Sequence, residues 1–206
     1  MPVFRLQLQN SANWALWLAE LRSDLLHKND YYWEILSGGF KRPRDEKSDI
    51  YKEWKRMDIY LMETMASRID RDLLYHLKQT SHACDAFETL CFLHSDLTPH
   101  AQNMDNHISS TFYRAWVKLE YCVGQAPQDF VYAFNLLATE VDEWCSIRSP
   151  AVFEQFLIAV SAHPSSAYWF ENLRRHPCSD RQVTERFLCN FVEFEKQRIS
   201  NEAKLS

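Results

Sequence analysis

Tryptophan is concentrated near the start of the chain, and this concentration limits the available folds more than any other feature. Trp14, Trp17 and Trp33 all fall within the stretch Ser11–Leu36. Leucines continue the helical spacing that begins at Trp14 and Trp17, so the stretch predicts helices with one apolar side. Because each tryptophan ring carries a large apolar area, we expect the later helices to cover this stretch.

Composition favours helices over sheets. Only three of the 206 residues are glycine, whereas 46% are hydrophobic. A β-sandwich needs many glycine turns, and this apolar content is ample for a core. Stripes of apolar residues at spacings of three and four recur along the chain, most clearly in Ile50–Met65, Ile108–Cys122 and Phe130–Trp144. The sequence therefore predicts an all-α protein of about nine short helices.

Certain residues indicate where helices begin and where one subdomain ends. Ser11, Asp30 and Ser81 are expected to cap helices, because short polar side chains accept hydrogen bonds from free N–H groups at a helix start. The alternation in Phe4–Leu8 is typical of a short strand. Gly124–Pro127 combines two residues that interrupt helices, so we expect two helical subdomains, 1–123 and 124–206. No repeat of fixed period is visible, which disfavours a solenoid.

Charge and hydropathy exclude several classes of partner. The net charge of −5 makes a general attraction to nucleic acid unfavourable. The basic cluster Lys41–Arg44 is followed at once by Asp45 and Glu46, which favours a solvated loop over a phosphate contact. The N-terminus lacks the apolar run of a signal peptide, and no window approaches the roughly 20 apolar residues of a membrane span. An intracellular protein, nuclear or cytoplasmic, with reduced cysteines is expected.

Two groups of residues have the chemistry of a metal or catalytic site. His82, Cys84, Cys91 and His94 are zinc-ligand types. Cys84 and Cys91, however, are seven residues apart on one helix, about 10 Å along its axis, which two zinc–sulfur bonds of about 2.3 Å cannot span. The pair in His176–Cys178 lacks a neighbour that would orient the base. We therefore assign no metal ligand, no cofactor and no catalytic residue.

Three consecutive aromatic residues stand apart from the core stripes. Tyr168, Trp169 and Phe170 cannot all face inward on one helix, so at least one of them should lie near the surface. They either contact the neighbouring subdomain or form a patch for self-association or protein binding. Together with Trp144, these three residues are the candidate interface.

A series of short motifs follows a recognisable order. The motifs of the first half are Asn13–Trp17, Trp33–Gly38, Trp54 with Asp58 and Leu61, and Ser81–Leu90. Those of the second half are Phe130 with Phe134 and Leu137, Phe156–Val160, Pro164–Phe170 and Glu195–Arg198. In order and spacing, over about residues 4–200, they resemble the Gag capsid region of copia-type LTR retrotransposons. The sequence departs from that family in three ways: it has no zinc knuckle, it has no basic tail, and Trp144–Ser146 replaces an expected glycine.

The resemblance implies two capsid-like helical subdomains and a function without catalysis. It implies a scaffold that associates with itself, as a homodimer or higher oligomer, and with a host protein complex, nuclear or chromatin-bound if the gene has been domesticated. The missing knuckle makes nucleic-acid binding through this chain alone unexpected. Alternatives are the capsid protein of an active copia-type element that forms virus-like particles, a monomeric helical adaptor, and a small helical enzyme with its site between the subdomains.

Overall fold

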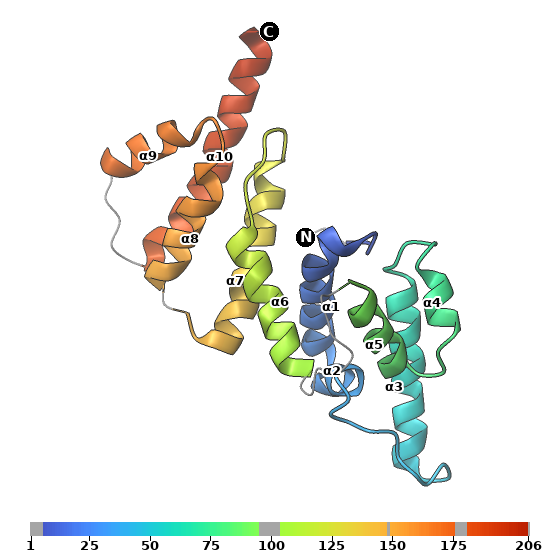
Figure 1. The fold of residues 1–206 in the computed structure, drawn as a ribbon. Helices are drawn as coiled ribbons and strands as arrows, with labels where there is room; N and C mark the ends of the chain where they lie inside the picture. Colours follow the sequence, from blue (N-terminus) through green and yellow to red (C-terminus); the bar gives the residue numbers. More distant parts are fainter. Residues whose placement is uncertain (1–5, 95–103, 148, 176–180, 206) are drawn as a thin grey trace. The chain divides into compact units, whose positions relative to one another are not determined.

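The computed structural model describes residues 6–94, 104–147, 149–175 and 181–205. Within these ranges it contains α-helices, one short 3-10 helix and no strand, which confirms the expected all-α class. None of the helices in the described part is long and apolar enough to cross a membrane. The elements, labelled in Figure 1, are η1 (Ser11–Asn13), α1 (Trp14–Lys28), α2 (Asp30–Leu36), α3 (Asp49–Ala66), α4 (Leu74–Lys78), α5 (Ala83–His94), α6 (Met104–Lys118), α7 (Pro127–Cys145), α8 (Ser149–Ser161), α9 (Ser166–Arg175) and α10 (Arg181–Leu205).

The starts of η1 and α2 lie one residue away from the expected caps. Asn10, not Ser11, caps η1, and its side chain accepts the N–H of Ala12. Asn29, not Asp30, caps α2, with its side-chain oxygen 3.0 Å from the backbone nitrogen of Tyr31. A capping residue must keep an extended backbone while its neighbour turns into the helix, and Asn29 does so with φ −171°.

Packing divides the chain into two compact units, Met1–Thr111 and Phe112–Ser206. The division falls inside α6 and earlier than the expected subdomains, 1–123 and 124–206. The reason is that the segment after Thr111 packs on later helices. The ring of Trp116 lies 6.2 Å from that of Phe134, and the backbone N–H of Tyr121 donates to the carbonyl of Ala159 at 2.8 Å.

Unit 1 is built around the tryptophans of α1. Trp17 is fully buried, stacks on Trp14 at 5.3 Å and donates its Nε1–H to the backbone carbonyl of Arg68 at 2.9 Å. Phe87 of α5 is fully buried in the same core, with its ring 5.7 Å from that of Trp33. Backbone N–H groups and carbonyls also join Leu8 to the 68–70 segment in a single parallel bridge, the one strand-like contact that the described part of 4–8 makes.

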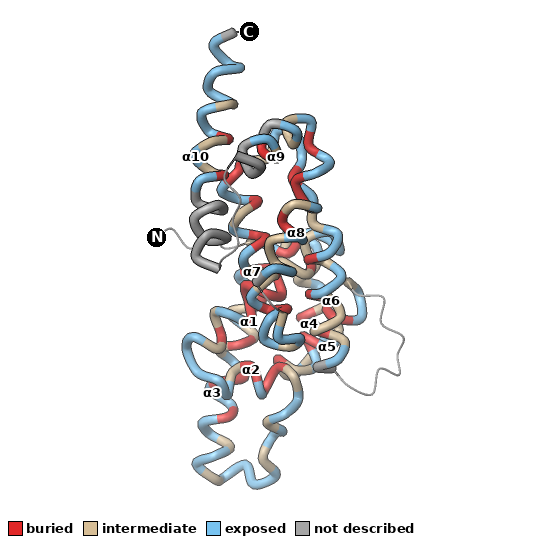
Figure 2. Tube along the Cα trace, turned by 90° about the vertical axis from the view of Figure 1, so that its left-hand side faces the viewer, coloured by how far each residue is buried: buried red, intermediate tan, exposed pale blue. Residues whose placement is uncertain are grey.

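Phenylalanines from three helices meet in the core of unit 2. Phe134 and Phe156 meet edge to face at 5.4 Å, and Phe191 of α10 meets Phe156 at 5.3 Å. All three are at most 2% exposed. Figure 2 shows buried positions recurring along one side of α7 and α8, as helices with one apolar face require.

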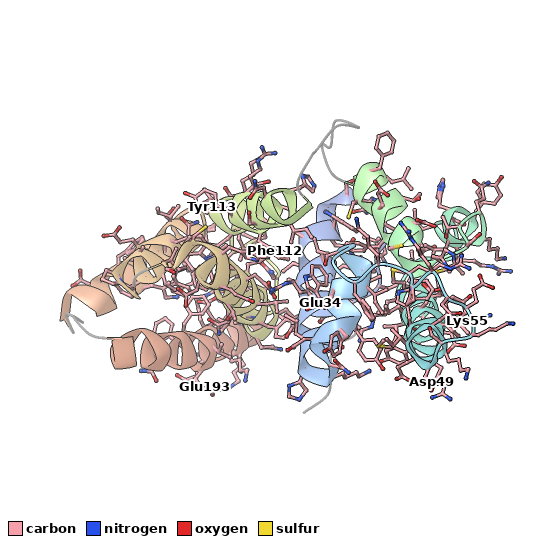
Figure 3. All side chains as sticks on the ribbon, turned by 90° about the horizontal axis from the view of Figure 1, so that it is seen from below. Glu34, Asp49, Lys55, Phe112, Tyr113 and Glu193 are labelled. Atoms are coloured by element: carbon pink, nitrogen blue, oxygen red, sulfur yellow. The ribbon has the colours of Figure 1, made fainter. Side chains whose placement is uncertain are left out.

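Two apolar stripes are shorter than their spacing predicts, one at its start and one at its end. Ile50 is 63% exposed, so the buried side of α3 begins at Trp54. Cys122 is exposed while Tyr121 is buried, because α6 ends at Lys118 and helical spacing no longer applies beyond it. On α6 itself, Phe112 is buried and its neighbour Tyr113 is 49% exposed. Figure 3 shows these two side chains leaving the helix in different directions.

Candidate functional site

One of the four residues expected to form an interface lies in a core. Trp169 is 2% exposed, so it belongs to the core of unit 2 and cannot present its ring to a partner. Trp144 and Phe170 are half-buried. The side chain of Tyr168 lies outside the described residues. The expectation of an aromatic association patch is therefore corrected at Trp169, whose ring faces α10.

Trp169 instead belongs to a cluster around a fully buried carboxylate, Glu195 of α10. One oxygen of Glu195 accepts the Nε1–H of Trp169 at 3.0 Å and the Nε–H of Arg198 at 2.9 Å. The other accepts the hydroxyl of Tyr121 at 3.1 Å and a second guanidinium N–H at 2.9 Å. We call these four residues the Glu195 cluster. A buried charge is tolerated only when it is paired and hydrogen-bonded, and Glu195 meets both conditions.

The environment holds two members of the Glu195 cluster, Tyr121 and Arg198, in their protonated forms. Burial, reinforced by the charge of Glu195, raises the pKa of Tyr121 well above its usual value, so its hydroxyl stays a donor. Hydrogen bonds to Glu195 and Glu202 raise the pKa of Arg198, which keeps its charge. A general acid or base must exchange its proton near neutral pH. Groups held in one protonation state suit a structural role better.

His163 closes the cluster from the turn before α9. Its ring stacks on that of Tyr121 at 4.7 Å and lies 5.2 Å from that of Trp169. Its Nδ1 accepts the backbone N–H of Ser165 at 3.1 Å, which requires this nitrogen to carry no proton. Burial lowers the pKa of His163, which favours the same neutral form. His163 therefore links the turn before α9 to the aromatic core.

An open groove lies directly beside the cluster, with a volume of about 780 Å³. One wall is the 121–127 segment, a second is the turn at His163, and the third is the C-terminal half of α10. Two apolar residues in these walls are conspicuously exposed, Val123 at 75% and Ile199 at 41%. Lys196 and Glu202 supply charges of opposite sign on the α10 wall. This groove is a candidate binding surface of unit 2.

A second polar cluster, in unit 1, joins three segments of the chain. The carboxylate of Asp58 on α3 is buried and accepts the backbone N–H of Ala83 at 2.7 Å, which caps α5 from another helix. Its other oxygen lies 3.1 Å from Nδ1 of His82, and Nε2 of the same ring lies 3.2 Å from a guanidinium nitrogen of Arg42. Arg42 can only donate, so Nε2 of His82 is the acceptor of that bond. All three groups are engaged within the unit.

The cysteines of α5, Cys84 and Cys91, are two of the four residues of zinc-ligand type. No cluster of three potential metal ligands occurs among the described residues. Burial raises the pKa of Cys91 to about 12, and burial together with Asp85 raises the pKa of Cys84. Both thiols are therefore poor sources of the thiolate that binds metals or attacks substrates. His82 faces Asp58 and the ring of His94 stacks on Trp14 at 5.6 Å, so the two histidines serve different contacts.

Sequence reasoning missed the central members of the Glu195 cluster. Glu195 and Arg198 entered only as a terminal motif of the resemblance, whereas Tyr121 and His163 were not singled out. The spacing of Glu195 and Arg198, i to i+3, favours an ion pair on a helix, but an exposed pair has the same spacing. Only the burial of Glu195 distinguishes the two cases, and that depends on tertiary packing.

No family model, no curated protein and no solved structure matches this chain.

Proposed function

We propose that the chain is a non-enzymatic, capsid-like helical module that associates with itself and serves as a scaffold for protein complexes. The observation that carries this proposal is the groove of unit 2, where Val123 and Ile199 expose apolar surface beside charges of both signs. Exposed apolar surface ringed by polar groups is typical of protein-binding sites.

The use of ionisable groups supports the same proposal. The carboxylates of Glu195 and Asp58 are buried, and each is hydrogen-bonded by groups of its own unit. Tyr121 and Cys91 have raised pKa values that disfavour their reactive, deprotonated forms. Chemistry at these positions would require the packing contacts to break first.

The experiment is a measurement of molar mass by light scattering or sedimentation equilibrium over a wide range of protein concentrations. We expect the mass to rise above the 24.5 kDa of one chain as concentration increases. A mass that stays at one chain throughout would contradict self-association. Electron microscopy of the same samples distinguishes a closed dimer from particles, which need at least two kinds of contact.

A suitable test variant must avoid the core. Trp169→Ala would remove a buried ring and a hydrogen bond to Glu195, so a loss of association would not separate surface effects from misfolding. The groove offers exposed positions instead, among them Val123 and Ile199.

A further inference from the structure

The turn before α9, residues 162–165, is held by its own histidine. The side-chain Nδ1 of His163 accepts the backbone N–H of Ser165 at 3.1 Å, and the backbone carbonyl of His163 accepts that of Ser166 at 2.9 Å. His163 is 5% exposed, and its ring stacks on that of Tyr121. One side chain therefore closes the turn and fastens it to the core of unit 2.

A proton on Nδ1 of His163 is incompatible with this arrangement. The nitrogen would become a donor, like the N–H of Ser165 that it faces, and the bond between them would be lost. The charge would also lie beside the rings of Tyr121 and Trp169, 4.7 and 5.2 Å away, at a position that is largely closed to water. Burying a charge without an acceptor costs far more than burying the neutral ring.

The charged groups that act on His163 all belong to α10: Glu195, Arg198 and Glu202. Glu195 already accepts four hydrogen bonds, which fills the lone pairs of a carboxylate. Glu202 is paired with Arg198 at 2.7 Å and is 64% exposed, so solvent screens it. Arg198 repels a second cation. Burial is the strongest influence on His163 and lowers its pKa, so the closed turn favours the neutral ring.

We infer that the turn before α9 is an acid-triggered device, which opens when Nδ1 of His163 takes up a proton. The open turn releases the imidazolium to water. Because His163, Pro164 and Ser165 form one wall of the groove, opening enlarges the groove and uncovers the ring of Tyr121 on which His163 stacks. The groove thus has a closed form at neutral pH and an open form in acid. The device works within a single chain, so it does not depend on the proposed self-association.

The test measures hydrogen exchange of the Ser165 and Ser166 amides by NMR in the full chain, from pH 7.5 to pH 5. Each rate is divided by the intrinsic exchange rate at that pH, which gives the fraction of open turn. The closed form binds the proton more weakly than the open form, so falling pH favours opening. We expect the open fraction to rise below pH 6.5, by at most about tenfold per pH unit.

Low concentrations of urea separate opening of the turn from unfolding of unit 2. Unfolding exposes much surface and responds steeply to urea, whereas the opening of one turn exposes little. We expect exchange at Ser165 and Ser166 to stay constant below the unfolding transition, while exchange at the buried Phe134 of α7 accelerates. If the two serine amides follow Phe134 instead, the turn opens only when unit 2 unfolds, and the device is overturned.

The decisive variant is His163→Asn, whose side-chain oxygen accepts the Ser165 N–H from nearly the position of Nδ1 but does not titrate. The open fraction should then be independent of pH. The matched control is His94→Asn in unit 1, which removes another histidine whose pKa burial lowers and should leave the response of the turn unchanged. A pH response that survives His163→Asn, or that disappears in His94→Asn, overturns the proposal.

The wild-type ring provides a second measurement in case His163→Asn does not fold. Nitrogen chemical shifts of the His163 imidazole distinguish a bare Nδ1 from a protonated one. We expect a bare Nδ1 at pH 7.5 and a protonated Nδ1 in the open turn at acid pH. A proton on Nδ1 at pH 7.5, or an open fraction that is the same at pH 5 and pH 7.5, contradicts the device.

Discussion

Glu195 shows how a single buried charge organises unit 2. Its carboxylate collects donors from α9, from α10 and from the segment after α6, and it is completely excluded from solvent. Removing one member of such a set leaves the others buried without a partner, and this desolvation outweighs the loss of any single hydrogen bond. The cluster therefore makes the position of Trp169 depend on the position of α10.

The variant Glu195→Gln tests this dependence. The amide keeps the shape but loses the charge, and its NH₂ group meets donors instead of acceptors. We expect the free energy of unfolding of unit 2 to fall by about 3 kcal/mol or more, measured by urea denaturation. Glu193→Gln, on an exposed position of the same helix (Figure 3), should change it by less than about 0.5 kcal/mol. Equal effects of the two substitutions would refute the assignment.

His163 makes stability depend on pH. Its pKa in the folded chain lies below the ordinary 6.5, so the unfolded chain binds the proton more readily. The stability it contributes is complete above pH 6.5 and is lost as the pH falls from there through the folded-state pKa. We expect His163→Gln to flatten this slope, by at most about 1.4 kcal/mol per pH unit. His94, whose pKa burial also lowers, should leave a residual slope. Unchanged slopes in denaturation curves from pH 5 to 7 would contradict the prediction.

At the scale of elements, α5 depends on α3 for its start. α3 has a local cap, Ser48, whose hydroxyl accepts the N–H of Tyr51 at 3.1 Å. α5 takes its acceptor from Asp58, 25 residues earlier in the chain. A local cap forms with its own helix, whereas a distant cap forms only when both helices pack. The Asp58–Ala83 bond therefore couples the formation of α5 to that of α3.

Substitution of the two caps should reveal this difference. Ser48→Ala should cost about 1 kcal/mol, the usual effect of losing an N-cap. Asp58→Ala should cost about 2 kcal/mol or more, because it also leaves His82 without its carboxylate partner. Urea denaturation monitored by tryptophan fluorescence measures both. If Asp58→Ala proves no more costly than Ser48→Ala, the tertiary cap contributes nothing beyond a local one.

At the scale of the whole molecule, the two units have separate cores. Leu21 belongs to the core of unit 1 and Phe134 to that of unit 2, and both are fully buried. We expect Leu21→Ala and Phe134→Ala each to cost about 2–5 kcal/mol, and each to lower amide protection in its own unit far more than in the other. Native-state hydrogen exchange measures this. A uniform loss of protection across both units would show that they unfold together.

The sequence by itself determined the helices, because apolar residues at spacings of three and four have only one way to share a buried face. It also determined that Trp17, Trp54 and Phe134 are buried, because large apolar rings at the positions of a stripe lose the most contact with water when that face packs. Asn10 and Asn29, by contrast, capped helices that Ser11 and Asp30 could have capped equally well, as neighbouring residues offer the same chemistry.

Only the tertiary structure decided where the stripes stop and which polar groups meet. Because α6 ends at Lys118, Tyr121 is the buried residue where the stripe predicted Cys122. The ring of Trp169 lies inside unit 2, where its indole N–H donates to the carboxylate of Glu195. Ser146 closes α7 in a left-handed conformation, φ 48°, at the place where the resemblance leads one to expect glycine. The burial of Tyr121 and Trp169 depends on contacts between residues far apart in the chain, and no local pattern encodes the free energy of such contacts.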